Sequence, residues 1–311
     1  MTGYQYIVAS GAGTDTVSFP DGRRMENVPG GAGFYALVGL FLWSDSVLMV
    51  CGVGPEYLAR HGAWYTNNAC STEGLVVRGQ ITPTSQVMYF EDGEREDKPD
   101  VGLHEFRKMD PEVTEVEAWV SDKTRGVYTF KHLATDYLDG LIALRRRYGF
   151  KLMWEISADA AIPRNLEKIE SYLPNIDVFS INRTEARTLY GTQDMGAIVH
   201  RFCERAVNWV YLRMGEAGAY VIAGNRPHSS PSVQMLDVVD PTGCGNSSSA
   251  GVLCGLCEGA DPLRAGLMGS ISAAYTLKQF GPPEVITAQT RSEARRLLED
   301  LYAGAKDKLP E

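Results

Sequence analysis

The sequence predicts an α/β fold in which a mainly parallel sheet is covered by helices on both faces. From about residue 115 onward, β-prone segments alternate with helical segments, as in successive βαβ units. The segment 46–54, SVLMVCGVG, is apolar throughout, which is typical of a strand buried on both sides. The mixed segments within about 16–30 and 82–100 do not fit that layer. We therefore expect one three-layer domain over residues 1–311, with a small separate sheet formed by these segments.

Local patterns place the individual elements of this fold. Strands are expected at 4–10, 46–54, 84–91, 118–122, 126–130, 150–156, 176–182, 208–215, 218–224 and 235–239. Helices are expected after the Gly-rich turn at 30–33, at 134–149, 163–173 and 183–191, directly after the loop 240–246, and from Asp261 and Thr290. Asp261 followed by Pro262 is a helix-start signal, and Thr290 with Glu293 has the spacing of a capping box.

Composition limits the classes of function. The 311 residues are 44% hydrophobic and carry a formal charge of −9, which argues against non-specific binding of nucleic acid. The start MTGYQYIVAS lacks the features of a secretory signal, and the longest apolar run, Ala36 to Trp43, is far shorter than the ~20 residues of a membrane helix. Six cysteines are too few for a disulfide scaffold. These features predict a cytoplasmic protein without a membrane segment.

Two of the cysteines, Cys254 and Cys257, form a C-x-x-C pattern inside an apolar segment. The spacing of three residues puts both thiols on one face of a helix. We interpret them as core thiols rather than as a redox or zinc pair.

The loop DPTGCGN, residues 240–246, has the composition of an anion-binding turn. Thr242, Gly243, Cys244 and Gly245 would leave backbone N–H groups unpaired at the start of a helix, where the helix dipole favours negative charge. Such an anion hole suits a transferring phosphoryl group. The alternative is an ordinary Gly-rich turn with Asn246 as the helix N-cap.

Several loops, taken in order, resemble the motifs of the ribokinase/PfkB family of sugar and nucleoside kinases. GAGTD, PGGAG and CGVGPEYLARHG resemble the substrate loops and the segment after the second core strand, and SINRTEA resembles the N-x-x-E motif. LRMGEAGAY resembles the step beside the nucleotide, DPTGCGN the D-T-x-G-A-G-D signature, and AAYTLKQFG the closing helix. The resemblance spans roughly residues 4 to 285. It implies a ribokinase-like α/β/α sandwich in which the small sheet is a lid over the substrate.

The resemblance also implies roles for individual residues. The acceptor, a sugar or nucleoside, would be bound by Asp15, Gly30 and Gly31, with Tyr35 and Glu155 also near it. The nucleotide ATP would lie beside Asn182, Glu185, Arg213, Gly215 and Thr242. Asn182 and Glu185 would position Mg²⁺, because a carboxylate and an amide oxygen suit a hard cation. Read from the residues alone, the same pair is a helix cap followed by a first-turn acid. Relatives often form dimers through the lid, so a homodimer is a further expectation.

The chain departs from the family pattern at the catalytic base. The signature normally ends in an aspartate that takes the proton from the attacking hydroxyl, but this sequence has Asn246. An amide has no useful basicity, and a positioned base contributes about 10²–10⁴-fold to the rate. Phe34 and Tyr35 are expected to crowd the substrate pocket. Trp154 and Glu155 stand where many relatives have an aspartate–proline–asparagine step, and Glu155 or an activated water is a candidate replacement base.

Three functions are consistent with this combination of features. The first is a weak or altered kinase that uses ATP and Mg²⁺, in which Gly243, Cys244 and Gly245 form the anion hole beside Asn246. The second is a nucleoside hydrolase on the same scaffold, in which Asn246 orients water or a ribose hydroxyl. The third is a catalytically silent protein that binds a nucleoside or nucleotide.

Overall fold

The computed structural model describes residues 3–91, 95–205, 208–233 and 238–306. Its main sheet has nine strands in the order β13-β12-β11-β10-β9-β8-β1-β4-β5, and all neighbours are parallel except the pairs β11–β12 and β12–β13. The strands are β1 (Tyr6–Ala9), β4 (Val47–Val53), β5 (Leu75–Val77), β8 (Gly126–Lys131), β9 (Lys151–Ile156), β10 (Val178–Asn182), β11 (Trp209–Arg213), β12 (Ala219–Ala223) and β13 (Arg226–Ser230). The predicted ribokinase-like α/β architecture is confirmed.

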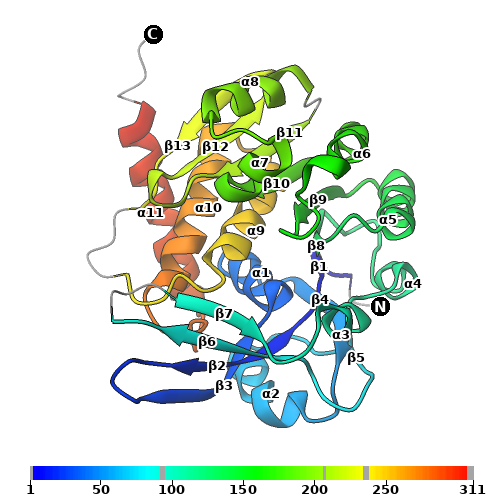
Figure 1. Ribbon diagram of the computed structural model, residues 1–311, viewed down its shortest axis with the longest axis vertical. Helices are drawn as coiled ribbons and strands as arrows, with labels where there is room; N and C mark the ends of the chain where they lie inside the picture. The colour runs from blue at the N-terminus through cyan, green and yellow to red at the C-terminus, as the bar shows by residue number, and fades with distance from the viewer. Residues whose placement is uncertain (1–2, 92–94, 206–207, 234–237, 307–311) are drawn as a thin grey trace.

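A second sheet of four strands forms the lid, in the order β3-β2-β6-β7. Its strands are β2 (Gly13–Ser18), β3 (Arg24–Gly30), β6 (Thr84–Tyr89) and β7 (Arg95–Pro99). Strand β2 follows β1 after a three-residue connection, so the lid is joined directly to an interior strand of the main sheet. The lid strands lie together at the lower left of Figure 1.

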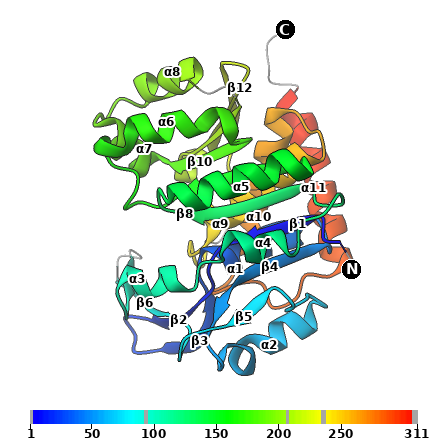
Figure 2. The same cartoon turned by 90° about the vertical axis from the view of Figure 1, so that its right-hand side faces the viewer.

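Helices cover both faces of the main sheet (Figures 1 and 2). Side chains of β1 alternate between two hydrophobic cores, Tyr6 and Val8 in one and Ile7 and Ala9 in the other. The first core is closed by α1 (Ala32–Phe41), α2 (Tyr57–Asn67), α9 (Cys244–Cys257), α10 (Pro262–Leu277) and α11 (Ala288–Lys306). The second is closed by α4 (Val113–Glu117), α5 (Thr135–Tyr148), α6 (Leu166–Tyr172), α7 (Arg183–Tyr190) and α8 (Met195–Arg205). The short helix α3 (Leu103–Lys108) buries no residue.

The helix signals in the sequence correspond to caps in the structure. The Asp261 side chain accepts the Arg264 N–H at 3.0 Å, with Pro262 as the first residue of α10. Helices α5 and α7 both end at a glycine in the left-handed conformation, Gly149 at φ 79° and Gly191 at φ 63°. The last helix is an exception: it begins at Ala288, so Thr290 lies in its first turn, and the Thr290 N–H donates to the Thr287 side chain instead of starting the predicted capping box.

Two predicted strands differ from the structure. Residues 118–122 form a turn after α4, because Trp119 and Val120 pack onto the second core and no strand pairs with them. The strand predicted at 235–239 lies mostly outside the described residues, and residues 238–239 are not in a strand.

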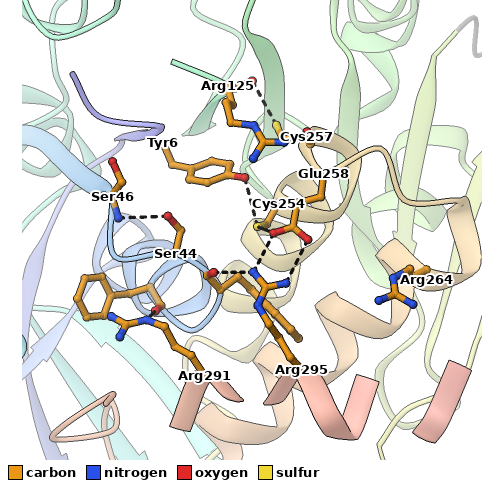
Figure 3. A network of polar contacts seen from close by, with 12 residues as sticks. Tyr6, Ser44, Ser46, Arg125, Cys254, Cys257, Glu258, Arg264, Arg291 and Arg295 are labelled. Carbon is orange, nitrogen blue, oxygen red and sulfur yellow. Dashed lines mark hydrogen bonds and ion pairs between the residues drawn. The ribbon is translucent and has the colours of Figure 1, made fainter. Parts of the chain in front are cut away.

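The C-x-x-C cysteines are core residues, as predicted. Cys254 is fully buried, Cys257 is half-buried, and both are free thiols. Figure 3 shows Cys254 between the Tyr6 hydroxyl and Glu258, while Cys257 contacts the Arg125 carbonyl oxygen. Burial raises the pKa of the Cys257 thiol to about 12, so this thiol is protonated at neutral pH.

No helix among residues 3–91, 95–205, 208–233 and 238–306 combines the length and hydropathy required to span a bilayer.

Candidate active site

The start of α9 forms a cradle for an anion. Gly243 is the N-cap residue at φ 73°, and the helix begins at Cys244, so Asn246 lies in the first turn rather than at the cap. In the described part of the chain, the N–H groups of Gly243, Gly245 and Asn246 have no hydrogen-bond partner. Unpaired donors at the positive end of a 14-residue helix attract negative charge. We call residues 242–246 the phosphate cradle.

The two glycines of the cradle are required by their neighbours. A Cβ on Gly243 would overlap the Tyr35 ring, and the left-handed backbone there also disfavours other residues. A Cβ on Gly245 would overlap the Arg213 guanidinium. The glycines therefore allow an aromatic ring and a cation to lie directly against the cradle.

Tyr35 and Phe34, both on α1, have different surroundings. Tyr35 is buried and lies against Gly243 of the cradle. Phe34 is fully buried in the first core, with its ring 4.8 Å from Trp64 and 5.9 Å from Tyr65. The expectation that both aromatic side chains crowd the substrate pocket is therefore wrong for Phe34, which points away from the cradle into the core.

The predicted acceptor-binding residues lie where the lid joins the main sheet. Asp15 is a buried residue of β2, and its carboxylate occupies the space that a Cβ on Gly30 would need. Gly31, at φ 88°, is the N-cap of α1, and a Cβ there would lie 2.7 Å from the Gly13 nitrogen. Helices α1 and α9 pack against each other, so Gly31 and the cradle lie at neighbouring helix starts. The structure thus brings Asp15, Gly30 and Gly31 together.

Asn246 is held by a buried polar network. Its Nδ2 donates to Glu155 Oε1 at 3.0 Å and to the Tyr128 hydroxyl at 3.2 Å. The Tyr128 hydroxyl in turn donates to Glu155 Oε2 at 2.8 Å. Because both amide N–H groups point at the network, the orientation leaves the Asn246 Oδ1 free of it as an acceptor. Burial, reinforced by Glu155, keeps the pKa of Tyr128 well above its ordinary value, so the hydroxyl remains a donor.

Glu155 does not offer an accessible base in this arrangement. Its side chain is 1% exposed at the end of β9, and both carboxylate oxygens have partners. It reaches the cradle only through Asn246 and Arg213. The geometry supports a positioning role, in which Glu155 orients the amide beside it. Trp154, its neighbour in sequence, is a core residue whose Nε1 donates to the Lys131 carbonyl oxygen at 2.9 Å.

Arg213 links the network to α7. This last residue of β11 places Nη2 2.9 Å from Glu155 Oε1 and 3.7 Å from Glu185 Oε2. Burial alone would lower the pKa of the guanidinium, but the two carboxylates outweigh it and raise the pKa above its ordinary value. Arg213 is therefore a permanent positive charge at the cradle.

Asn182 and Glu185 form a capping box at the start of α7. The Asn182 side-chain oxygen accepts the Glu185 N–H at 2.9 Å, and Glu185 Oε2 accepts the Asn182 N–H at 2.9 Å. Burial raises the pKa of Glu185, although Arg213 opposes this shift. No group of three or more potential metal ligands occurs among the described residues. Helix capping and Arg213 already engage two of the three side-chain oxygens of this pair, Asn182 Oδ1 and Glu185 Oε2.

The remaining nucleotide-binding candidates flank the cradle. Gly215, at φ 67°, starts the turn between β11 and β12, and a side chain there would point into open space. Thr242 is the first residue of the cradle, and its N–H donates to Asp240 Oδ1 at 2.8 Å.

Asp240 is a site residue to which the sequence assigned no role. It is 1% exposed and accepts hydrogen bonds from three different segments. These donors are the Tyr89 hydroxyl from the lid, the Thr242 N–H from the cradle and the Gly281 N–H at 3.2 Å. In the lid, the Tyr89 ring stacks on Phe19 at 5.7 Å. Asp240 therefore ties the lid to the cradle.

A mainly parallel sheet with a lid and an anion cradle at a helix start defines the class of protein, a scaffold for phosphoryl transfer. The profile of the pfkB family carbohydrate kinases matches residues 8–288, so the chain belongs to this family. Kinases of this family typically use ATP and Mg²⁺.

Similar proteins agree with this assignment. A sugar kinase of Archaeoglobus fulgidus, described as uncharacterized, is 25% identical over 245 residues, covering 75% of this chain and 95% of its own. Cytidine kinase of Thermococcus kodakarensis is 23% identical over 279 residues, covering 88% and 96%. The structure of Arabidopsis thaliana ribokinase complexed with ribose and ATP superimposes with a TM-score of 0.73 at 17% identity, covering 96% of this chain and 99% of that one.

Proposed function

We propose that this chain transfers the terminal phosphoryl group of ATP to a hydroxyl of a sugar or nucleoside, at a rate reduced by Asn246. The observation that carries the proposal is the set of N–H groups of Gly243, Gly245 and Asn246 at the start of α9, which have no partner among the described residues. Donors fixed in this way stabilise the charge that develops during phosphoryl transfer. Membership of a kinase family and the similarity to a cytidine kinase support the same reaction class.

The acceptor would bind between the lid and the cradle. Asp15, Gly30 and Gly31 would hold its hydroxyl groups, with the reacting hydroxyl directed at Asn246. Because Nδ2 is engaged by Glu155 and Tyr128, the Asn246 Oδ1 is oriented to accept a hydrogen bond from that hydroxyl. The amide thus positions the nucleophile without taking its proton, which passes to an oxygen of the transferred phosphoryl group as the new O–P bond forms and ADP leaves. Positioning and electrostatic stabilisation still support transfer, because both dominate phosphoryl-transfer catalysis.

The nucleotide would bind on the other side of the cradle. Thr242 and Gly215 would flank the phosphates, and Arg213 would contribute positive charge. Asn182 and Glu185 would order this edge of the site by capping α7. No step of the proposed transfer is assigned to Mg²⁺, because Asn182 Oδ1 and Glu185 Oε2 are already engaged in the capping box.

A panel assay tests this function. The purified protein is incubated with nucleosides and sugars, with and without ATP and Mg²⁺, and products are identified by mass spectrometry. We expect a phosphorylated acceptor that forms only when ATP is present. Release of free base without ATP would instead establish the nucleoside hydrolase. Binding of a nucleoside or nucleotide without any product would establish the silent binding protein.

A homodimer formed through the lid is part of the same proposal. Met25 in β3 and Phe90 after β6 are exposed apolar side chains on the lid segments, and a dimer would cover them. Sedimentation equilibrium decides this point, because a monomer at all concentrations tested would exclude it.

A further inference from the structure

Two carboxylates converge on one guanidinium beside the cradle. Glu155 comes from the end of β9 and Glu185 from the first turn of α7, and Arg213 Nη2 lies 2.9 Å and 3.7 Å from their nearest oxygens. Carboxylate oxygens are ligands of divalent cations, so a cation held between these two side chains would compete with the guanidinium for the same oxygens. In this structure, a side chain supplies the positive charge between them.

The guanidinium also faces the cradle. Its Nη1 packs directly against Gly245, where a Cβ would overlap it. Nη1 has no hydrogen-bond partner in the described part of the chain, and Nε is buried without one. With Nη2 at Glu155 and Nε buried, Nη1 is the nitrogen that can donate a charge-assisted hydrogen bond to a phosphate in the cradle. Arg213 therefore has spare donors at the place where the N–H groups of the cradle converge.

The charge balance of the cluster fits this arrangement. With Glu155, Glu185 and Arg213 ionised, the cluster carries one net negative charge. An aspartate at position 246 would add a further carboxylate 3.0 Å from Glu155. Asn246 is neutral and adds no negative charge to the cluster. The single positive charge of Arg213 is therefore enough for the cradle to attract an anion.

We propose that Arg213 is a built-in cation that takes over, at this cradle, the charge-neutralising role otherwise expected of a metal ion. The inference rests on the proposed function, because it takes the ligand to be a nucleoside triphosphate bound through its phosphates. Its consequence is that the polyphosphate binds without Mg²⁺. Because the guanidinium lies between Glu155 and Glu185, a metal ion would have to displace it to bind at that position.

The test compares two variants that differ only at Arg213. Removing Arg213 alone would leave Glu155 as a buried unpaired charge and endanger folding, so both variants carry Glu155→Gln. Binding of ATP and of inorganic tripolyphosphate is measured by calorimetry, in EDTA and in Mg²⁺, for the wild type, E155Q and E155Q/R213M. Arg226→Met, an exposed site at the far end of the β12–β13 hairpin, controls for the loss of one positive charge. Thermal melting confirms that each variant is folded.

We expect the wild type to bind ATP in EDTA about as tightly as in Mg²⁺, and E155Q to bind it more tightly in EDTA. E155Q/R213M should bind at least about tenfold more weakly than E155Q in EDTA, whereas R226M should match the wild type. Binding by the wild type that requires Mg²⁺, or equal affinities of E155Q and E155Q/R213M, would overturn the inference. Metal-free binding that depends on Arg213 without phosphotransfer to any acceptor would refute the proposed reaction and support this role of Arg213.

Discussion

Restoring an aspartate at position 246 tests the proposed reaction, and the structure indicates that one substitution is not enough. Asn246 Nδ2 lies 3.0 Å from Glu155 Oε1, so Asn246→Asp exchanges a hydrogen bond for two facing carboxylates. Two like charges about 4 Å apart repel by about 4 kcal/mol at an effective dielectric constant of about 20. Arg213 offsets part of this repulsion, and proton uptake by one carboxylate relieves the rest.

A second substitution should remove the conflict. In N246D/E155Q the amide and the carboxylate exchange places, so the introduced glutamine can donate to the new aspartate and leave it ionised. We expect kcat of this double variant to rise about 10²-fold or more, because a positioned general base contributes about 10²–10⁴-fold. In N246D alone, the repulsion raises the pKa of the new carboxyl. The single variant therefore holds less of the base form at neutral pH and should gain less.

The assay measures kcat against pH for the wild type, N246D, E155Q and N246D/E155Q with the best acceptor from the panel. The double variant should acquire an acidic limb in which activity falls as the aspartate is protonated. In N246D alone this limb should lie at higher pH, and E155Q alone should gain no base-dependent activity. The reasoning fails if the double variant is no faster than the wild type, or if N246D alone equals it.

Three further predictions follow from other contacts. Gly243→Ala should lower the free energy of unfolding, measured by chemical denaturation, by about 1–2 kcal/mol from the strain of the left-handed backbone alone. The added Cβ would also displace Tyr35 and should abolish ATP binding, measured by calorimetry. Tyr89→Phe removes the hydroxyl that holds the lid at Asp240, and should raise the acceptor KM about fivefold, a loss of about 1 kcal/mol. Burial lowers the pKa of His61 to about 4. The unfolded chain therefore takes up a proton at this imidazole at a higher pH than the folded chain does, and the free energy of unfolding should fall as the pH falls from about 6.5 to 4. His61→Gln should flatten this part of the plot of unfolding free energy against pH.

Elements with strong local signals could be predicted from the sequence. The apolar strand at 47–53 and the helix that starts after Asp261 depend on residues close together in the chain. The strand predicted at 118–122 is wrong. Trp119 and Val120 pack against the second core without pairing with a strand, and this packing accounts for their apolar character. A short apolar run carries the same pattern in both cases.

The candidate site could be located from motifs, but its internal contacts could not. Glu155 and Arg213 lie on β9 and β11, which are separated in the sheet by β10, so only the strand order brings their ends together. Tyr128 sits within a buried strand, where a tyrosine gives the same signal as any core residue. The capping box of Asn182 and Glu185 was one of two readings of the sequence, and the structure shows that this reading describes their contacts.

The shared carboxylate of Asp240 has a consequence for the order of binding. Asp240 accepts hydrogen bonds from a lid residue, from the first N–H of the cradle and from the N–H of Gly281. One buried carboxylate therefore connects the acceptor side of the site to the nucleotide side. If an acceptor that closes the lid tightens the nucleotide site by some factor, the nucleotide must tighten the acceptor site by the same factor. The two substrates would then bind cooperatively through a carboxylate that touches neither of them.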